Sequence, residues 1–248
     1  MNSNKEAEVF SILQKLKDEN KKQNFHKQGK SKKSSNANAK TDLSATVREA
    51  AKWQYGRGDT SLKIKVEKDN IVLKKYKPKA HTEILCVLDT SRSQGFESRL
   101  SFAKGLILNL LSKAYVDREK AGLIVFSDRK AEMLIPVTKS AGLAARQLEK
   151  IKASGNTPLA EGLEKAFEYI EYRKKRENEL LSIMLIVTDG KGNFAQNGED
   201  PLEAAWKAAK KISTKDIKTL VADTENSVFG LKLAKKLADI LGGEYIAI

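Results

Sequence analysis

The chain has few of the features that mark secreted and membrane-bound proteins. Its 248 residues include a single cysteine, Cys86, so no internal disulfide can form, and the apolar residues around it predict a buried thiol. No apolar run approaches the roughly 18 residues of a membrane-spanning helix. The first ten residues lack the apolar stretch of a signal peptide. We therefore expect a cytoplasmic protein without a membrane span.

Motifs of two large enzyme classes are missing as well. His26 lies in a lysine-rich segment and His81 just before the first long apolar run, so a histidine-based catalytic triad is not expected. No G-x-G-x-x-G follows that run, which disfavours a dinucleotide-binding fold. Residues 29–31 read Gly-Lys-Ser, like the end of a phosphate-binding loop. Position 24 holds Asn where that loop requires glycine, so we interpret the match as accidental.

Acidic residues are absent from residues 21–40, although the whole chain has 46 basic and 32 acidic residues and a net charge of +14. This segment contains seven lysines, and so half of the excess charge, among Ser, Asn and Gln. The composition is typical of a disordered linker, which we place at residues 21–41 and expect to contact acidic partners. No aromatic-interleaved basic motif accompanies the lysines, so nucleic-acid binding is not expected.

Two shorter segments flank this linker. In residues 1–20 apolar side chains recur near helical spacing, which predicts an amphipathic helix that either packs locally or docks on a partner. Residues 42–80 favour a helix capped by Asp42, followed by a lysine-rich strand pair. We treat these residues as an extension of the main domain, which we place at residues 81–248.

Strands and helices alternate regularly throughout the main domain. Apolar runs predict strands at 84–88, 122–126 and 181–187, with weaker ones at 132–137, 217–222 and 244–248. Helical patterns lie between them, near 97–115, 140–152, 159–175, 201–212 and 227–241. This order predicts an α/β fold with a doubly wound, mostly parallel sheet and helices on both faces. Ligands of such sheets bind outside the carboxyl ends of the strands.

Oxygen-bearing side chains follow three of the predicted elements. Asp89, Ser91 and Ser93 come directly after the first core strand, at alternate positions that can point the same way. Thr157 precedes a helix, and Asp189 follows another buried strand. Taken alone, Thr157 could be a helix cap and Asp189 a turn residue. Together they predict a site for a hard cation such as Mg²⁺, which prefers oxygen ligands.

These motifs resemble a known family. The combination of D-x-S-x-S, a threonine in an S-G-x-T-P loop and a T-D-G strand end is similar to the metal-ion-dependent adhesion site of von Willebrand factor A domains. Residues 45–51, 155–163 and 221–226 resemble the C-terminal half of the magnesium chelatase D subunit, and the likeness covers about residues 43–248. Arg92 and Gln94 depart from the Gly and Met that are usual there. The AAA+-like domain with which such subunits usually begin is not expected in this chain.

The resemblance implies a function. Asp89, Ser91, Ser93, Thr157 and Asp189 would bind Mg²⁺, and a carboxylate from a partner would complete its coordination shell. The domain would then be a non-catalytic docking subunit of an ATP-dependent chelatase that inserts Mg²⁺ or Co²⁺ into a tetrapyrrole. Its partners would be an AAA+ ATPase subunit and a large tetrapyrrole-binding catalytic subunit.

Two alternatives remain open from the sequence. Other von Willebrand factor A domains partner AAA+ ATPases in the maturation of metalloenzymes, and this chain could serve such a system. An aspartate after an apolar strand also resembles the nucleophile of haloacid-dehalogenase-type phosphatases. Those enzymes require D-x-D, and Ser91 occupies the second acidic position.

Overall fold

The structure is a computed structural model with two compact units, residues 1–25 with 80–248 and residues 26–79. The residues that the structure describes are 2–30, 41–58, 63–73, 81–92, 96–117, 120–177, 180–225 and 231–248. Within these ranges no helix is both long and apolar enough to cross a bilayer.

The larger unit is built on a six-stranded sheet in the order β3-β2-β1-β4-β5-β6. The strands are β1 (His81–Asp89), β2 (Lys120–Ser127), β3 (Lys130–Thr138), β4 (Leu180–Thr188), β5 (Lys218–Asp223) and β6 (Glu244–Ala247). Neighbouring strands are parallel except β3, which follows β2 in a hairpin and pairs with it in the antiparallel direction. The predicted doubly wound, mostly parallel sheet is confirmed.

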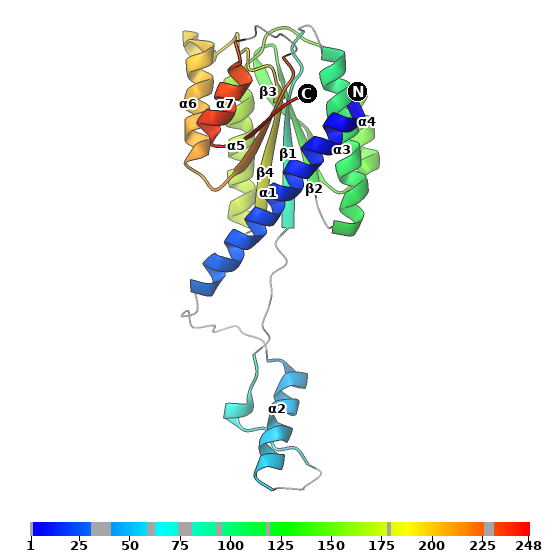
Figure 1. The fold of residues 1–248 in the computed structure, drawn as a ribbon, viewed down its shortest axis with the longest axis vertical. Helices are drawn as coiled ribbons and strands as arrows, with labels where there is room; N and C mark the ends of the chain where they lie inside the picture. The colour runs from blue at the N-terminus through cyan, green and yellow to red at the C-terminus, as the bar shows by residue number, and fades with distance from the viewer. Residues whose placement is uncertain are drawn as a thin grey trace. The chain divides into compact units, whose positions relative to one another are not determined.

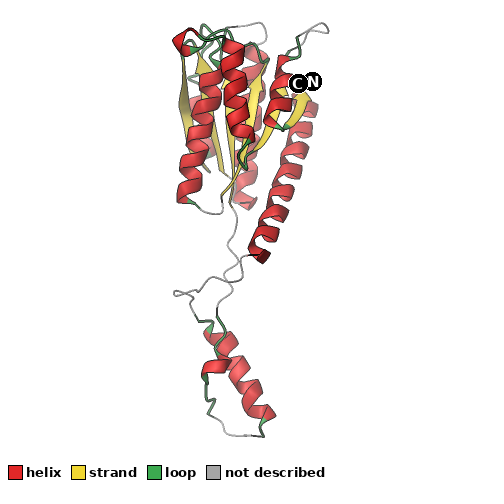
Figure 2. Ribbon diagram, turned by 90° about the vertical axis from the view of Figure 1, so that its left-hand side faces the viewer, coloured by secondary structure: helices red, strands yellow, loops and turns green. Residues whose placement is uncertain are grey.

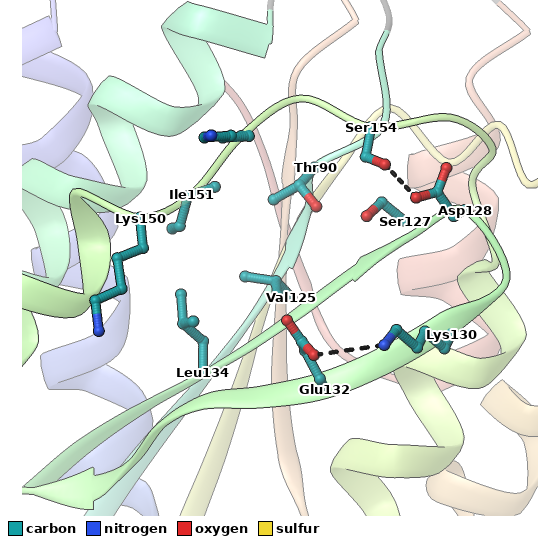
Figure 3. Close-up of a pocket in the computed structure, with 11 residues that line it drawn as sticks. Thr90, Val125, Ser127, Asp128, Lys130, Glu132, Leu134, Lys150, Ile151 and Ser154 are labelled. Atoms are coloured by element: carbon teal, nitrogen blue, oxygen red, sulfur yellow. Dashed lines mark hydrogen bonds and ion pairs between the residues drawn. The ribbon is translucent and has the colours of Figure 1, made fainter.

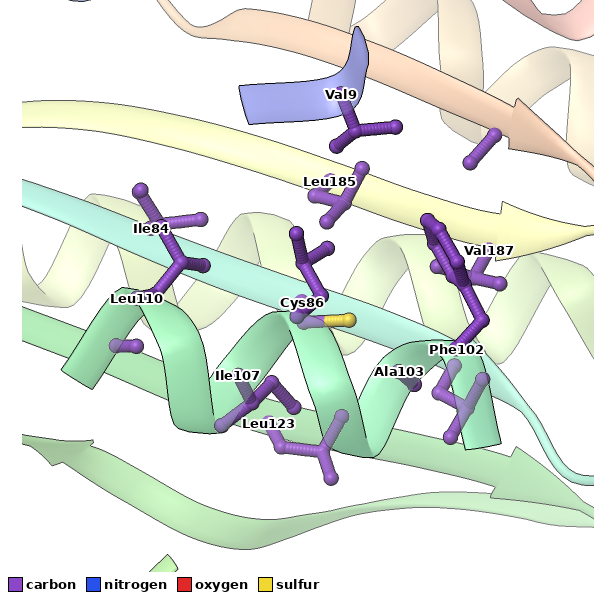
Figure 4. Close-up of a cluster of buried hydrophobic side chains, with 14 of the residues drawn as sticks. Val9, Ile84, Cys86, Phe102, Ala103, Ile107, Leu110, Leu123, Leu185 and Val187 are labelled. Atoms are coloured by element: carbon purple, nitrogen blue, oxygen red, sulfur yellow. The ribbon is translucent and has the colours of Figure 1, made fainter. Parts of the chain in front are cut away.

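Both faces of the sheet are buried, as the uninterrupted apolar runs indicate. Successive side chains of β1 alternate between two cores: Ile84 and Cys86 pack on one face, Leu85 and Val87 on the other. Figure 4 shows the first of these cores. Burial raises the pKa of the Cys86 thiol to about 12, so this cysteine is a neutral core residue, as predicted.

Three helices cover each face (Figures 1 and 2). On one side lie α1 (Asn2–Lys30), α3 (Phe96–Asp117) and α4 (Ala141–Leu148), and on the other α5 (Leu159–Arg176), α6 (Pro201–Ser213) and α7 (Leu233–Leu241). Helix α6 begins where expected, because Asp200 accepts hydrogen bonds from the amides of Leu202 and Glu203. Helix α7 is shorter than predicted: Lys232 has a left-handed backbone, and residues 226–230 lie outside the described ranges.

The N-terminal helix packs on this unit. Val9, Leu13 and Leu16 of α1 are buried in the core with β1 and α3. Polar contacts at the edge add to this packing, since Lys5 Nζ donates to the Ala247 carbonyl at 2.6 Å. The backbone helix continues to Lys30, through part of the segment in which a linker was expected. Lysine and glutamine, which dominate that stretch, have helix propensities close to that of alanine.

The smaller unit contains the helix expected after Asp42, α2 (Leu43–Gly56). Asp42 Oδ1 accepts a hydrogen bond from the Ala45 amide at 3.0 Å and caps this helix. The strand pair predicted after it does not form within residues 63–73, which contain only the 3-10 helix η1 (Lys68–Asn70) and an isolated bridge between Leu73 and Thr41. An isolated two-stranded ribbon is only marginally stable in water, so alternation of apolar and polar residues was not sufficient to predict a strand pair here.

Candidate metal centre

Asp89 is the last residue of β1, and its carboxylate is held on both oxygens. Its side chain is buried, with 1% of the residue exposed. Oδ1 accepts a hydrogen bond from the Ser91 amide at 2.9 Å, and Oδ2 accepts one from Thr188 Oγ1 at 3.3 Å. Burial raises the pKa of Asp89, while the positive charge of Arg99 acts against that shift. The carboxylate therefore occupies one orientation, in a place with little water.

Arg99 is a buried cation in the first turn of α3 that the sequence analysis did not select. It is 1% exposed, and its Nη2 donates a hydrogen bond of 2.9 Å to the Ser91 carbonyl. This contact ties the helix to the loop after β1. The available signal was a basic residue at a helix position otherwise occupied by core side chains. Only the packed structure shows that its charge acts on Asp89.

The loop after β1 is joined to the connection between α4 and α5. The Ser154 amide donates to the Thr90 carbonyl at 3.0 Å, and the Arg92 amide donates to the Ser154 carbonyl at 2.9 Å. Ser91 is 3% exposed and pairs with Ser154 in an isolated parallel bridge. The side chain of Arg92 is exposed. Ser93, the remaining predicted ligand of this loop, lies outside the described residues.

Thr157 is buried at the end of the loop before α5. Its amide donates to Asn193 Oδ1 at 2.7 Å, and the Asn193 amide donates back to the Thr157 carbonyl at 3.2 Å. Pro158 occupies the cap position of α5, and no side chain caps this helix. The capping role considered for Thr157 is therefore not realised. Asn193, which the sequence analysis also missed, connects the Thr157 loop to the loop after β4.

Asp189 follows β4 at the same edge of the sheet as Asp89. Its Oδ1 accepts a hydrogen bond from the Lys191 amide at 2.9 Å, so it has the turn contact that its position suggested. Its negative charge also raises the pKa of Asp89, which places the two carboxylates within electrostatic reach. Gly190 has a φ of +77°, and a Cβ there would overlap the backbone of Ala234. Only glycine fits this turn.

The donor set fits a hard divalent cation. Asp89, Ser91, Thr157 and Asp189 offer carboxylate and hydroxyl oxygens from three loops at one edge of the sheet. Among the described residues no group of three or more His, Cys, Asp or Glu side chains gathers as a metal site. A cation here would rely on hydroxyls and water beside two carboxylates, which suits Mg²⁺ and not Zn²⁺.

Known proteins share this architecture. Residues 84–191 match the von Willebrand factor type A domain. A magnesium-chelatase 67 kDa subunit of Heliobacterium mobile is 31% identical over 219 residues, which are 84% of this chain and 33% of that subunit. An uncharacterised protein of Methanocaldococcus jannaschii is 34% identical over 155 residues, 62% of this chain and 88% of that protein.

A solved structure supports the fold alone. The von Willebrand factor domain of the type V pili tip protein Mfa5 from Porphyromonas gingivalis has a TM-score of 0.53 at 10% identity, over 68% of this chain and 90% of that domain. The present chain spans about a third of the length of the chelatase subunit of Heliobacterium mobile. Sheet order, strand-end motifs and sequence likeness thus agree that the chain belongs to the von Willebrand factor type A domain family, with magnesium-chelatase subunits among its relatives.

Proposed function

We propose that this domain is a docking module that holds Mg²⁺ and uses it to bind a carboxylate of a partner protein. Asp89, Ser91, Thr157 and Asp189 would hold the ion, together with Ser93. When bound, the ion supplies positive charge and a coordination position that a partner's carboxylate oxygen can take. The domain itself would carry no catalytic residue.

The observation that carries this proposal is the burial of the Asp89 carboxylate close to a second one. Desolvation, with a smaller contribution from the charge of Asp189, raises the pKa of Asp89 and outweighs the opposing effects of Arg99 and Ser91. A divalent cation held by these residues would offset the repulsion between the two carboxylates. The hydrogen bonds from the Ser91 amide and Thr188 hydroxyl would keep Asp89 oriented whether or not the ion is bound.

The relatives suggest the complex in which such docking would operate. Several are magnesium-chelatase subunits, so we place the chain in an ATP-dependent chelatase that inserts Mg²⁺ or Co²⁺ into a tetrapyrrole. It would bridge an AAA+ ATPase subunit and the large tetrapyrrole-binding subunit, in the cytoplasm. The inserted metal is the substrate of that complex and is distinct from the ion at the docking site.

A second candidate keeps the site and changes the complex. The chain matches most of an uncharacterised relative that does not carry a chelatase name. This match supports a second candidate function, in which the chain assists another AAA+ ATPase in metalloenzyme maturation. Binding assays against both kinds of ATPase separate the two candidates. The phosphatase alternative lacks its second acidic residue, because position 91 is Ser.

The test is binding of the AAA+ chelatase subunit from the same organism, measured by calorimetry with Mg²⁺ and with EDTA. We expect EDTA and Asp89→Ala each to weaken binding at least about tenfold, since both remove the coordination that the partner carboxylate completes. Asp239→Ala, at an exposed position of α7, is the matched control and should bind normally. Unchanged affinity with EDTA and with Asp89→Ala would refute the docking mechanism.

A further inference from the structure

A cavity of about 240 Å³ lies beside the loop after β1. It is bounded by the end of β1, by the β2–β3 hairpin and by the connection between α4 and α5 (Figure 3). A single water molecule in the liquid occupies about 30 Å³, so this space can admit a whole side chain. No role in the metal centre accounts for it.

The cavity and the candidate metal centre share a wall. Thr90 and Ser154 line the cavity, and Ser91, the predicted ligand next to Thr90, pairs with Ser154. The Ser154 amide donates to the Thr90 carbonyl, and the Thr90 amide donates to the Phe126 carbonyl, both at 3.0 Å. A partner segment whose carboxylate reaches the metal centre would therefore have its neighbouring residues beside the cavity.

The turn between β2 and β3 packs closely against the other side of this wall. Asp128, in the turn between β2 and β3, has a φ of +57° and accepts a hydrogen bond from the Ser154 hydroxyl. Its amide donates to the Asn156 carbonyl at 2.9 Å. A Cβ at Gly155 would overlap Asp128 Oδ1, so a larger residue there would displace the Asp128 side chain. The cavity wall is thus a defined surface, held by side-chain and backbone contacts.

The base of the cavity is apolar. Val125, Leu134 and Ile151 line it, and all three belong to or pack against the core under α3 and α4. In Figure 3 they surround the cavity together with Thr90. Leu134 and Ile151 are only partly buried, so an aliphatic side chain placed here would remove their remaining apolar surface from water.

The rim of the cavity favours an acidic ligand. Glu132 lies 4.0 Å from Lys130, and Asp128 accepts a hydrogen bond from the uncharged Ser154 hydroxyl, so the lining has three lysines against two acids. Lys150 and Lys152 are exposed and form no ion pair within the described part of the chain. The chain's net charge of +14 adds to the attraction for acidic proteins.

We propose that this cavity is a specificity pocket for an aliphatic side chain within an acidic segment of the partner protein. One carboxylate of the segment binds at the metal centre, the aliphatic side chain enters the cavity, and further carboxylates meet Lys150 and Lys152. The pocket rests on the proposed docking function and adds the sequence character of the partner to it. The metal centre would bind a carboxylate of the segment, and the cavity would bind the aliphatic side chain of a neighbouring residue.

Two synthetic peptides test the pocket. The acetylated and amidated peptide Glu-Leu-Asp-Glu and its counterpart Glu-Ser-Asp-Glu carry equal charge and differ only in the aliphatic side chain. Each is titrated into ¹⁵N-labelled full chain with Mg²⁺, and the Kd is taken from amide chemical shifts. We expect the leucine peptide to bind about tenfold more tightly and to shift the amides of Leu134 and Ile151.

Variants assign the effect to the cavity. Ile151→Ser should remove the preference for leucine, and the double variant Lys150→Glu/Lys152→Glu should weaken both peptides about tenfold. Lys150 and Lys152 have exposed side chains, so we expect the double variant to fold normally. Its peptide affinities can therefore be measured even if Ile151→Ser fails to fold. Lys165→Glu, on the exposed face of α5, is the control and should leave both affinities unchanged.

The outcomes separate the pocket from the metal centre. Equal affinity for the two peptides, or no binding of either, overturns the pocket. Loss of binding in EDTA together with equal affinities in Mg²⁺ supports the metal centre alone. A preference for leucine that EDTA does not alter supports the pocket and contradicts the metal-dependent function. Binding of tetrathymidylate as tight as that of the leucine peptide would contradict the assignment of an acidic protein segment.

Discussion

The Thr188 hydroxyl donates a hydrogen bond of 3.3 Å to Asp89 Oδ2 and also accepts one of 3.1 Å from the Gly190 amide. Thr188 is the last residue of β4 and Asp89 the last of β1, so this contact joins the ends of two neighbouring parallel strands. One hydroxyl thereby orients the central carboxylate and shapes the turn that carries Asp189. The two strand-end motifs act as one unit because of it.

Thr188→Val should therefore affect both stability and metal binding. Valine has the same shape but leaves Asp89 Oδ2 and the Gly190 amide without this partner, at a cost of about 1–3 kcal/mol in the free energy of unfolding. We also expect weaker Mg²⁺ binding, because the carboxylate loses its fixed orientation. Urea unfolding in EDTA and a Mg²⁺ titration measure the two effects. Ser112→Ala on the exposed side of α3 is the control, and identical Mg²⁺ affinity of wild type and Thr188→Val would contradict the prediction.

The ion pair at the opposite end of the sheet should matter for stability but not for docking. Glu83 of β1 has a side chain that is 4% exposed, and it accepts hydrogen bonds from Arg173 and from Lys120 Nζ, the latter at 3.4 Å. Glu83→Ala leaves Arg173 and Lys120 with the partly exposed Glu177 as their acidic partner and removes the hydrogen bonds to Glu83, so it should lower the free energy of unfolding by about 1–3 kcal/mol. Urea unfolding measures this loss.

The matched control for that variant is Glu168→Ala, at an exposed position of α5. It should change the free energy of unfolding by less than about 0.5 kcal/mol. Mg²⁺ affinity should stay normal in both variants wherever they remain folded, because Glu83 lies at the start of β1 and the candidate metal centre at its end. A large loss of Mg²⁺ affinity in folded Glu83→Ala would show that the two ends are coupled.

Helix α1 should behave as part of the core. Leu13 is fully buried, and its truncation in Leu13→Ala should lower the free energy of unfolding by about 2–5 kcal/mol. Ser11→Ala, on the exposed side of the same helix, should be close to neutral. Equal stability of the two variants would mean that α1 detaches from the sheet in solution and is available to a partner.

Asp223 should make the protein less stable as the pH rises. Burial raises the pKa of its carboxyl, and nearby Glu225 and Asp189 act in the same direction. The folded chain therefore binds this proton more tightly than the unfolded chain, whose aspartate pKa is about 3.9. The stabilisation is complete below that pH and is lost as the pH rises through the folded-state pKa.

Asp223→Asn removes this titration. The stability of the variant relative to wild type should rise as the pH increases from about 4 to 7, and urea unfolding at each pH measures the difference. Tyr245 donates a hydrogen bond of 2.8 Å to Asp223 Oδ2, so Tyr245→Phe tests whether this contact contributes to the same profile. A difference between wild type and Asp223→Asn that is constant with pH would contradict the prediction.

Local patterns were sufficient to predict the sheet and to place Asp89 and Asp189 at one edge of it. Apolar runs identified the six strands, and the clearest runs belong to β1, β2 and β4, because a strand buried on both faces needs apolar side chains at successive positions. The same logic located Asp89 and Asp189, since the carboxyl ends of parallel strands meet at one edge of the sheet. The strand pair expected near residues 62–73 does not form within the described residues 63–73, because alternation of apolar and polar residues indicates a possible sheet face but supplies no further strand to pair with.

The sequence by itself determined the α/β architecture and the residue types at the strand ends, because both depend on periodicities of two and 3.6 residues along the chain. Only the tertiary structure showed that Arg99 approaches Asp89, that Asn193 clamps Thr157 and that α1 completes the core. It also placed a cavity against Thr90 and Ser154. Each of these contacts joins residues that are distant in the chain or on different elements, and their spacing carries no periodic signal. These contacts are determined by packing and desolvation, which act when the helices and strands come together.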